Sequence, residues 1–195
     1  MQETKKINLL ALCQSGIFIA LATVLSFLPV YKMPMGGSVT LASMLPILLI
    51  GIRFGYKWGL GASFLYALIQ VAQALISGDV FATSMSAGVV IVCLLFDYLV
   101  PFTILGLSAF AKPKEGEKIN IGKAMATFSV IIVVRFLCHY LTGVTIWGQW
   151  APEGMGPFLY SLIYNGQYML PELIITVAIA FFILSSKQIE KLLTK

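Results

Sequence analysis

Residues 135–172 read RFLCHYLTGVTIWGQWAPEGMGPFLYSLIYNGQYMLPE, a stretch that begins inside one very apolar segment and ends inside the next. It contains an arginine, the single histidine of the chain, two of its three tryptophans and two glutamates. Its tyrosines recur at four-residue spacing, at Tyr160, Tyr164 and Tyr168. Polar and aromatic side chains placed in this way between apolar segments predict the lining of a polar cavity between two membrane helices.

The rest of the chain has the composition of a membrane protein. Of its 195 residues, 59% are hydrophobic and only 11% are charged, whereas a soluble domain carries about 25% charged residues. At ~20 residues per span, the length permits about six spans and no sizeable extramembrane domain. We therefore expect an all-α integral membrane protein in which residues 1–195 form a single membrane domain. The expected helices are about 8–30, 39–52, 58–77, 87–111, 121–147 and 158–185.

The basic residues predict how the spans are oriented. The net charge is +5 and, with the N-terminus inside, eleven of the 13 Lys and Arg residues fall on the cytoplasmic side. Only Lys32 then lies outside, and Arg135 lies within a span. The excess of basic residues in cytoplasmic loops predicts that both termini are cytoplasmic and that loops 31–38, 78–86 and 148–157 are external. The same placement explains the positive charge without a nucleic-acid partner.

Three ionisable residues fall well inside the expected spans: Asp97, Arg135 and Glu172. A charge at the bilayer centre costs about 2.5–3.5 kcal/mol on insertion scales, so such groups face a cavity or pair with one another. A structural pair of Arg135 with either acid is therefore one interpretation, and a ligand site is the other. Pro101 follows Asp97 by four residues and cannot donate to its carbonyl, which predicts a kink at the acid.

Helical periodicity groups the polar residues of the last two spans. Ser161, Asn165, Tyr168 and Glu172 fall within about 60° of one another on a helical wheel. His139 lies one turn from Arg135 on the preceding span. We expect these groups to converge on a pocket that opens outward beneath loop 148–157.

Such a pocket suits a flat aromatic cation. Aromatic rings attract cations by about 0.5–2 kcal/mol, an acid supplies the counter-charge, and an amide and a histidine can recognise a heteroaromatic ring. For Trp150, Phe158 and Tyr164 we expect instead a place in an interfacial aromatic belt.

Four blocks of sequence resemble one transporter family. They are MPMGGSVTLASMLP (33–46), LFDYLVPF (95–102), RFLCHYLTGVTIWG (135–148) and LYSLIYNGQYMLPE (159–172). Together they resemble the thiamine-specific S-component of energy-coupling factor (ECF) vitamin transporters. The resemblance implies a six-helix S-component bundle in the bacterial cell membrane. It also implies that thiamine binds from the outside and that a transmembrane coupling subunit and two ABC-type ATPases drive uptake.

The resemblance also implies roles for individual residues. The positions that match substrate-binding residues of the family are Asp97, Tyr98, Arg135, His139, Gly143, Trp147, Tyr160 and Asn165. Gly16 and Ala20 match the small-residue motif that docks the coupling subunit. Small residues four apart also let helices pack closely, so packing within the bundle is the alternative for this pair. A thiamine precursor or another vitamin remains an alternative ligand.

Several functions are disfavoured by missing motifs. The segment GEKINIGK (116–123) differs from a phosphate-binding loop, because five residues separate Gly116 from Gly122 and Ala124 replaces the required hydroxyl residue. We therefore expect no cofactor, with ATP used only by partner subunits. The three cysteines show no metal-ligand spacing, and no HExxH or GxSxG motif suggests an intramembrane enzyme. A self-sufficient channel or secondary carrier remains the second class of function that the sequence allows, beside the binding subunit of an importer.

Overall fold

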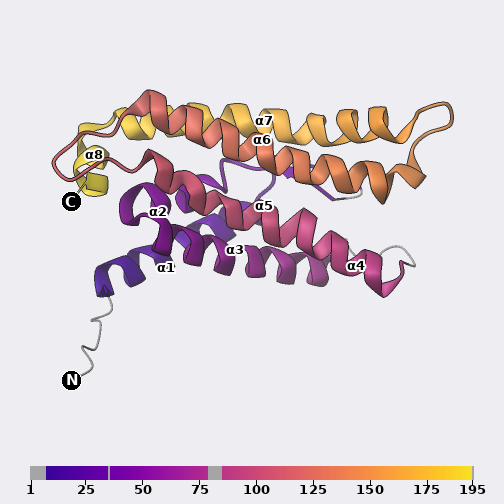
Figure 1. The fold of residues 1–195 in the computed structure, drawn as a ribbon, viewed down its shortest axis with the longest axis horizontal. Helices are drawn as coiled ribbons and strands as arrows, with labels where there is room; N and C mark the ends of the chain where they lie inside the picture. The colour runs from indigo at the N-terminus through magenta and orange to yellow at the C-terminus, as the bar shows by residue number, and fades with distance from the viewer. Residues whose placement is uncertain (1–7, 35, 79–84, 195) are drawn as a thin grey trace, which may run out of the picture.

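The computed structural model describes residues 8–34, 36–78 and 85–194. It is a bundle of long helices that run roughly parallel or antiparallel to one axis (Figure 1). Within the described residues, five helical segments are long and apolar enough to cross a membrane. They are α1 (Leu9–Ser26), α3 (Tyr56–Ser77), the segment Ala87–Ala111, α6 (Ile121–Thr145) and α7 (Pro157–Ser185). A shorter apolar helix, α2 (Leu45–Phe54), completes the set. The expected all-α membrane architecture is confirmed.

The segment Ala87–Ala111 changes its helical geometry three times. Its successive parts are α4 (Ala87–Cys93), the π-helix η1 (Leu94–Leu99), α5 (Val100–Thr103) and the 3₁₀-helix η2 (Ile104–Ala111). Two smaller elements follow the long helices near the end of the chain: the 3₁₀ turn η3 (Trp147–Trp150) after α6, and α8 (Lys187–Thr194) after α7.

The expected helix boundaries need correction around residues 27–44. The helix expected at 8–30 ends at Ser26, and the one expected at 39–52 begins at Leu45. Between them, β1 (Tyr31–Lys32) pairs antiparallel with β2 (Ser38–Val39). The chain reverses direction at Gly36 and Gly37, whose φ angles of 91° and 87° strongly favour glycine. Residues 30–34 and 36–40 are called the hairpin below.

Other boundaries follow from local chemistry. Asn120 caps α6 by accepting a hydrogen bond from the Lys123 N–H at 2.9 Å, and Pro157 occupies the first turn of α7, where its missing N–H costs nothing. Helix α6 ends at Thr145 rather than 147 because Trp147 belongs to the tighter turn η3. The helix α8 was not expected. Of the loop expected at 78–86, residues 79–84 lie outside the described part of the chain.

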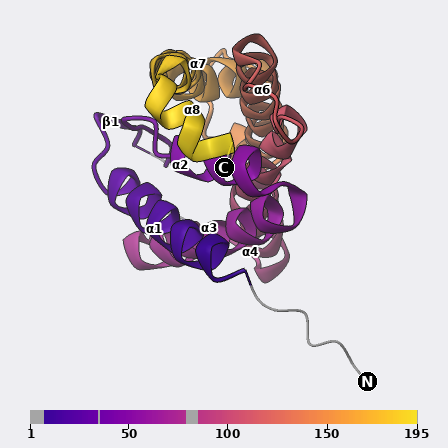
Figure 2. The ribbon, with the colours of Figure 1, turned by 90° about the vertical axis from the view of Figure 1, so that its left-hand side faces the viewer.

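Helix α2 lies inside the bundle. Seen end-on, the long helices surround it (Figure 2), and it packs against α1, α3 and η2. Three glycines allow backbones to touch there: a Cβ on Gly106 would lie 2.5 Å from the carbonyl carbon of Gly59, and one on Gly51 would lie 2.9 Å from a backbone nitrogen of η2. Small residues at such contacts are typical of packing in lipid. The outer faces of the helices are apolar and exposed, as a membrane environment requires.

Candidate functional site

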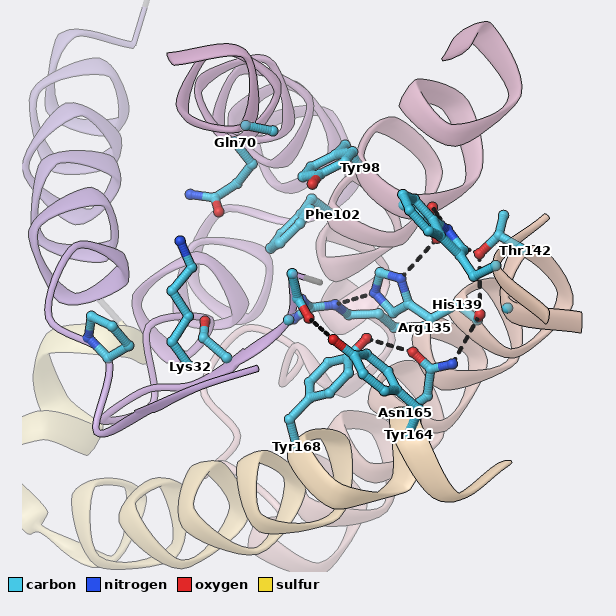
Figure 3. A pocket seen from close by; sticks show the side chains of 18 of the residues that line it. Lys32, Gln70, Tyr98, Phe102, Arg135, His139, Thr142, Tyr164, Asn165 and Tyr168 are labelled. Atoms are coloured by element: carbon cyan, nitrogen blue, oxygen red, sulfur yellow. Dashed lines mark hydrogen bonds and ion pairs between the residues drawn. The ribbon is translucent and has the colours of Figure 1, made fainter. Parts of the chain in front are cut away.

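A cavity of about 430 Å³ lies between α1, α3, η1, α6, α7 and the hairpin, and a cavity of this size accommodates a small organic ligand. Figure 3 shows Lys32 and Gln70 on one side of it and His139, Thr142 and Asn165 on the other. All eight residues expected to bind substrate line this cavity: Asp97, Tyr98, Arg135, His139, Gly143, Trp147, Tyr160 and Asn165. The structure therefore brings together groups from four separate parts of the chain.

Asp97 is the centre of a hydrogen-bond network at one end of the cavity. Its Oδ1 accepts hydrogen bonds from the Thr142 hydroxyl and from His139 Nδ1, the latter at 3.2 Å. Its Oδ2 accepts from Trp147 Nε1 at 3.2 Å. The carboxylate thus fixes the orientation of the histidine and the tryptophan while its side chain stays 13% exposed.

The backbone at Asp97 has the irregular geometry that Pro101 predicts. The Val100 N–H bonds to the Leu95 carbonyl, five residues earlier, so residues 94–99 form a π-helix. In a regular α-helix the N–H of residue 101 would donate to the carbonyl of Asp97. Pro101 has no N–H, so this hydrogen bond cannot form. π-Helical turns of this kind occur frequently at functional sites, and among the described residues that line the cavity this turn carries the only acid.

Arg135 is held by neutral groups. Its Nε donates to His139 Nε2 at 3.3 Å, its Nη1 contacts Met44 Sδ at 2.6 Å, and its guanidinium carbon lies 4.1 Å from the centre of the Phe102 ring. Because Nε2 accepts from Arg135, the proton of the neutral imidazole is placed on Nδ1, which donates to Asp97. Among the described residues no ion pair joins Arg135 to an acid within 4 Å, so neither of the two pairings considered from sequence is formed.

The polar stripe expected on α7 is confirmed as a buried face. Ser161, Asn165, Tyr168 and Glu172 are all buried. Asn165 Nδ2 donates to the carbonyl oxygen of His139 at 3.2 Å, and Asn165 Oδ1 accepts from the Tyr168 hydroxyl at 2.8 Å. The stripe therefore joins α7 to the backbone of the histidine on α6.

Gly143 makes this close approach of α6 and α7 possible. A Cβ at Gly143 would overlap Ser161 Oγ and lie 2.9 Å from Asn165 Nδ2. Ser161 Oγ also donates to the Tyr140 carbonyl at 2.8 Å. The glycine thus lets the polar face of α7 reach the backbone of α6.

The belt interpretation is wrong for one of the three aromatic residues. Tyr164 lines the cavity, and its hydroxyl donates to the Gly36 carbonyl at 3.0 Å. Phe158 is 67% exposed, as an interfacial residue would be. Trp150 packs against Trp147, with 5.6 Å between their ring centroids.

Glu172 does not partner Arg135 either. Its two carboxylate oxygens accept hydrogen bonds from Thr40, one from the backbone N–H at 2.6 Å and one from the hydroxyl at 2.7 Å. Sequence patterns did not reveal this contact because its partners are 132 residues apart.

Several cavity residues were not predicted from sequence. They include the polar residues Lys32 and Ser38 of the hairpin, Ser26, Gln70, Gln73 and Thr142. The two glutamines could have been found, because polar side chains three residues apart in an apolar span share a helix face. Their amide groups donate to Ser26 Oγ at 3.2 and 3.0 Å, joining α1 to α3. Lys32 and Ser38 lack such a signal because they lie in strands of two residues, which are too short to show a periodicity.

Gly16 and Ala20 lie on the outer face of α1 and are both exposed. A Cβ added at Gly16 would meet no atom within 4 Å. Packing within the bundle, the alternative considered for this pair, is therefore wrong, and the pair forms an open strip of small residues.

The comparisons with known proteins agree with one another. The model of the family described as "Thiamine transporter protein (Thia_YuaJ)" matches residues 12–192. The chain belongs to this family of thiamine transporter proteins. The chain is 34% identical over 184 residues to "Thiamine transporter ThiT" of Bacillus subtilis (strain 168), covering 90% of this chain and 89% of that protein.

More distant relatives show the same likeness. The identity to "Thiamine transporter ThiT" of Lacticaseibacillus paracasei is 24% over 192 residues, covering 95% of this chain and 90% of that one. A solved structure of ThiT from Listeria monocytogenes superposes with a TM-score of 0.67 at 25% identity, covering 92% of this chain and 96% of that one. The family resemblance seen in the sequence is confirmed. As a member of the thiamine transporter family, the chain is a multi-pass bacterial membrane protein that serves transport and is not an enzyme.

Proposed function

We propose that this chain is the thiamine-binding subunit of an ECF-type importer and that it captures thiamine from the external side. The observation that carries the proposal is the Asp97 network, in which one carboxylate aligns a histidine and a tryptophan at the wall of a cavity of about 430 Å³. Membership of the thiamine transporter family supports the choice of ligand.

The chemistry of the cavity matches the two rings of thiamine. The thiazolium ring is a flat cation, for which Asp97 provides a counter-charge and Trp147 an aromatic face. The aminopyrimidine ring offers hydrogen-bond donors and acceptors. His139, Tyr160 and Asn165 supply complementary polar groups around the same cavity.

The proposal assigns energy coupling to partner proteins. The chain carries no nucleotide-hydrolysis motif in its sequence, so the ATPases would be separate subunits joined through a membrane coupling protein. No cofactor is required for binding in this scheme. The exposed Gly16 and Ala20 on α1 are the proposed docking strip, because small residues allow a second helix to approach closely.

Tryptophan fluorescence tests the ligand assignment. We expect thiamine to quench the fluorescence of the purified protein at micromolar concentration or below. Trp147→Phe should remove most of the quenching, whereas Trp150→Phe is the matched control and should keep it. Asp97→Asn should weaken binding by about a hundredfold, because a charge partner is lost in a partly buried site. Equal binding by Asp97→Asn would contradict the proposed role.

Three further measurements test the rest of the proposal. A titration with the separate pyrimidine and thiazole halves of thiamine, and with other vitamins, identifies the ligand. Thiamine uptake into liposomes that contain this chain alone would favour a self-sufficient carrier. Bulky replacement of Gly16 and Ala20 by Leu should abolish co-purification with the coupling subunit and leave thiamine binding intact.

A further inference from the structure

Glu172 is a buried carboxylate that the ligand site does not use. It is 2% exposed, it is absent from the cavity lining, and among the described residues no cation lies within ion-pair distance of it. Burying a carboxylate is costly unless hydrogen bonds compensate it. Within the described part of the chain its hydrogen-bond donor is Thr40, at the end of the hairpin, which uses both its N–H and its hydroxyl. Both oxygens of the carboxylate are thus hydrogen-bonded to the same segment of the chain.

We propose that Glu172 is the positioning residue that holds the hairpin against α7. By holding the hairpin there, Glu172 determines how slowly a ligand leaves the cavity, and this effect on the ligand rests on the proposed function. The hairpin contributes Lys32, Gly36, Gly37 and Ser38 to the cavity wall. Anything that fixes the hairpin therefore fixes one wall of the site. Glu172 acts through this wall without touching the ligand.

Three side chains on successive turns of α7 contact the hairpin. The Tyr164 hydroxyl donates to the Gly36 carbonyl at 3.0 Å. The Tyr168 ring packs so closely on Gly37 that a Cβ there would lie 2.6 Å from it. Glu172 makes the third contact, and it is the only charge-assisted one. Hydrogen bonds to ionised groups are roughly twice as strong as neutral ones, so the Glu172 contact dominates the attachment.

The Thr40 end of the contact is itself fixed. The single hydroxyl proton of Thr40 goes to Glu172, since a carboxylate only accepts. Thr40 Oγ1 then accepts from the Ser43 backbone N–H at 3.0 Å and from the Ser43 hydroxyl at 2.9 Å. This turn holds Ala42 at a φ of 58°, an unfavourable angle for a residue other than glycine. The anchor therefore connects α7 to the residues that lead directly into α2.

The matched variants follow from this geometry. Thr40→Val removes the hydroxyl and keeps the shape of the side chain, whereas Thr40→Ser keeps the hydroxyl. Glu172→Gln removes the charge. Thr176→Val is the control: Thr176 lies one turn beyond Glu172, is fully buried, and its hydroxyl has no hydrogen-bond partner among the described residues.

Two readouts are measured on the purified full chain. The first is the rate at which a thiol reagent labels Ser38→Cys, in a Cys13→Ala background because Cys13 is exposed, without any ligand. The second is the rate of thiamine dissociation by stopped-flow fluorescence, measured in chains that retain Ser38. We expect Thr40→Val and Glu172→Gln to raise both rates about tenfold. Thr40→Ser and Thr176→Val should match the wild type.

The outcomes separate this proposal from the proposed function. Unchanged labelling in Thr40→Val and Glu172→Gln overturns it, and so does an equal increase in Thr176→Val, which would indicate general loosening of α7. Faster dissociation without faster labelling overturns it too, because ligand release would then not depend on movement of the hairpin. If the wild type binds no thiamine but labelling rises as expected, the positioning of the hairpin by Glu172 stands and the ligand assignment fails.

Discussion

The two ends of the bundle are built differently although the same long helices run through both. At one end, on the left in Figure 1, α2 fills the interior. At the other end the cavity and the hairpin take its place. The 10-residue α2 spans about 15 Å at 1.5 Å per residue, which is too short to reach along the 25-residue α6. The site therefore occupies the space that a full-length sixth helix would have filled.

The residues at the two ends match this division. Around α2 the interior is close-packed and apolar, with Ile47, Leu48 and Ile50 fully buried and glycine backbones in contact. At the cavity end the facing side chains are polar and hydrogen-bonded to one another. Backbone contact through small residues therefore stabilises this bundle at one end, whereas hydrogen bonding between side chains from distant parts of the chain shapes it at the other.

The largest loss of stability is expected from adding a methyl group where two backbones touch at the α2 end. In Gly106→Ala the new Cβ would lie 2.5 Å from backbone atoms of Gly59 and Leu60, and backbone cannot move aside as a side chain can. We expect a loss of about 3 kcal/mol in the free energy of unfolding, measured by thermal unfolding in detergent. Gly166→Ala is the control, because a Cβ there meets no atom within 4 Å. Equal stability of the two variants would contradict backbone packing at this end.

A smaller effect on stability is expected from the same substitution at the cavity end. The Cβ of Gly143→Ala would meet the side chains of Ser161 and Asn165, which can shift, so the cost is about 1–2 kcal/mol. Because Asn165 is displaced from the His139 carbonyl, we also expect thiamine affinity to fall about tenfold. Adding Ser161→Ala should restore most of the stability, and a double variant no more stable than Gly143→Ala would contradict the steric explanation.

A smaller effect, on thiamine binding, is expected from Phe102, which lies where the two ends meet. Phe102 lies beneath the Arg135 guanidinium at 4.1 Å, an arrangement that contributes about 1 kcal/mol. Phe102→Leu should therefore weaken thiamine binding about fivefold, whereas Phe102→Tyr should preserve it. Titration of both variants by tryptophan fluorescence provides the test, and identical affinities for Leu and Tyr would show that the ring does not hold Arg135 in place.

The smallest effect is expected on the outer face of α1. Gly16→Ala introduces a Cβ into open space, so nothing opposes the better helix propensity of alanine, and stability should rise by about 0.5–1 kcal/mol. Thermal unfolding measures this change beside that of Gly106→Ala. A decrease in stability would show that this face is packed against something within the bundle.

Much of the fold and part of the site could be predicted from the sequence, because those features depend on neighbours along the chain. The polar face of α7 was predicted from four-residue spacing, and the irregular helix at Asp97 from the position of Pro101. The family blocks indicated the eight cavity residues. The hairpin was missed because strands of two residues have no periodicity to detect.

The sequence by itself determined that this protein is a helical membrane protein, which segments cross the membrane, and that polar and aromatic residues gather on the last two spans. Tertiary structure alone decided the partners of those residues. Arg135 binds His139, Met44 and Phe102 instead of an acid, and Glu172 holds Thr40 from 132 residues away. The physical reason is that periodicity specifies which face of a helix is buried, whereas the choice of partner on that face depends on how the helices and the hairpin pack in space.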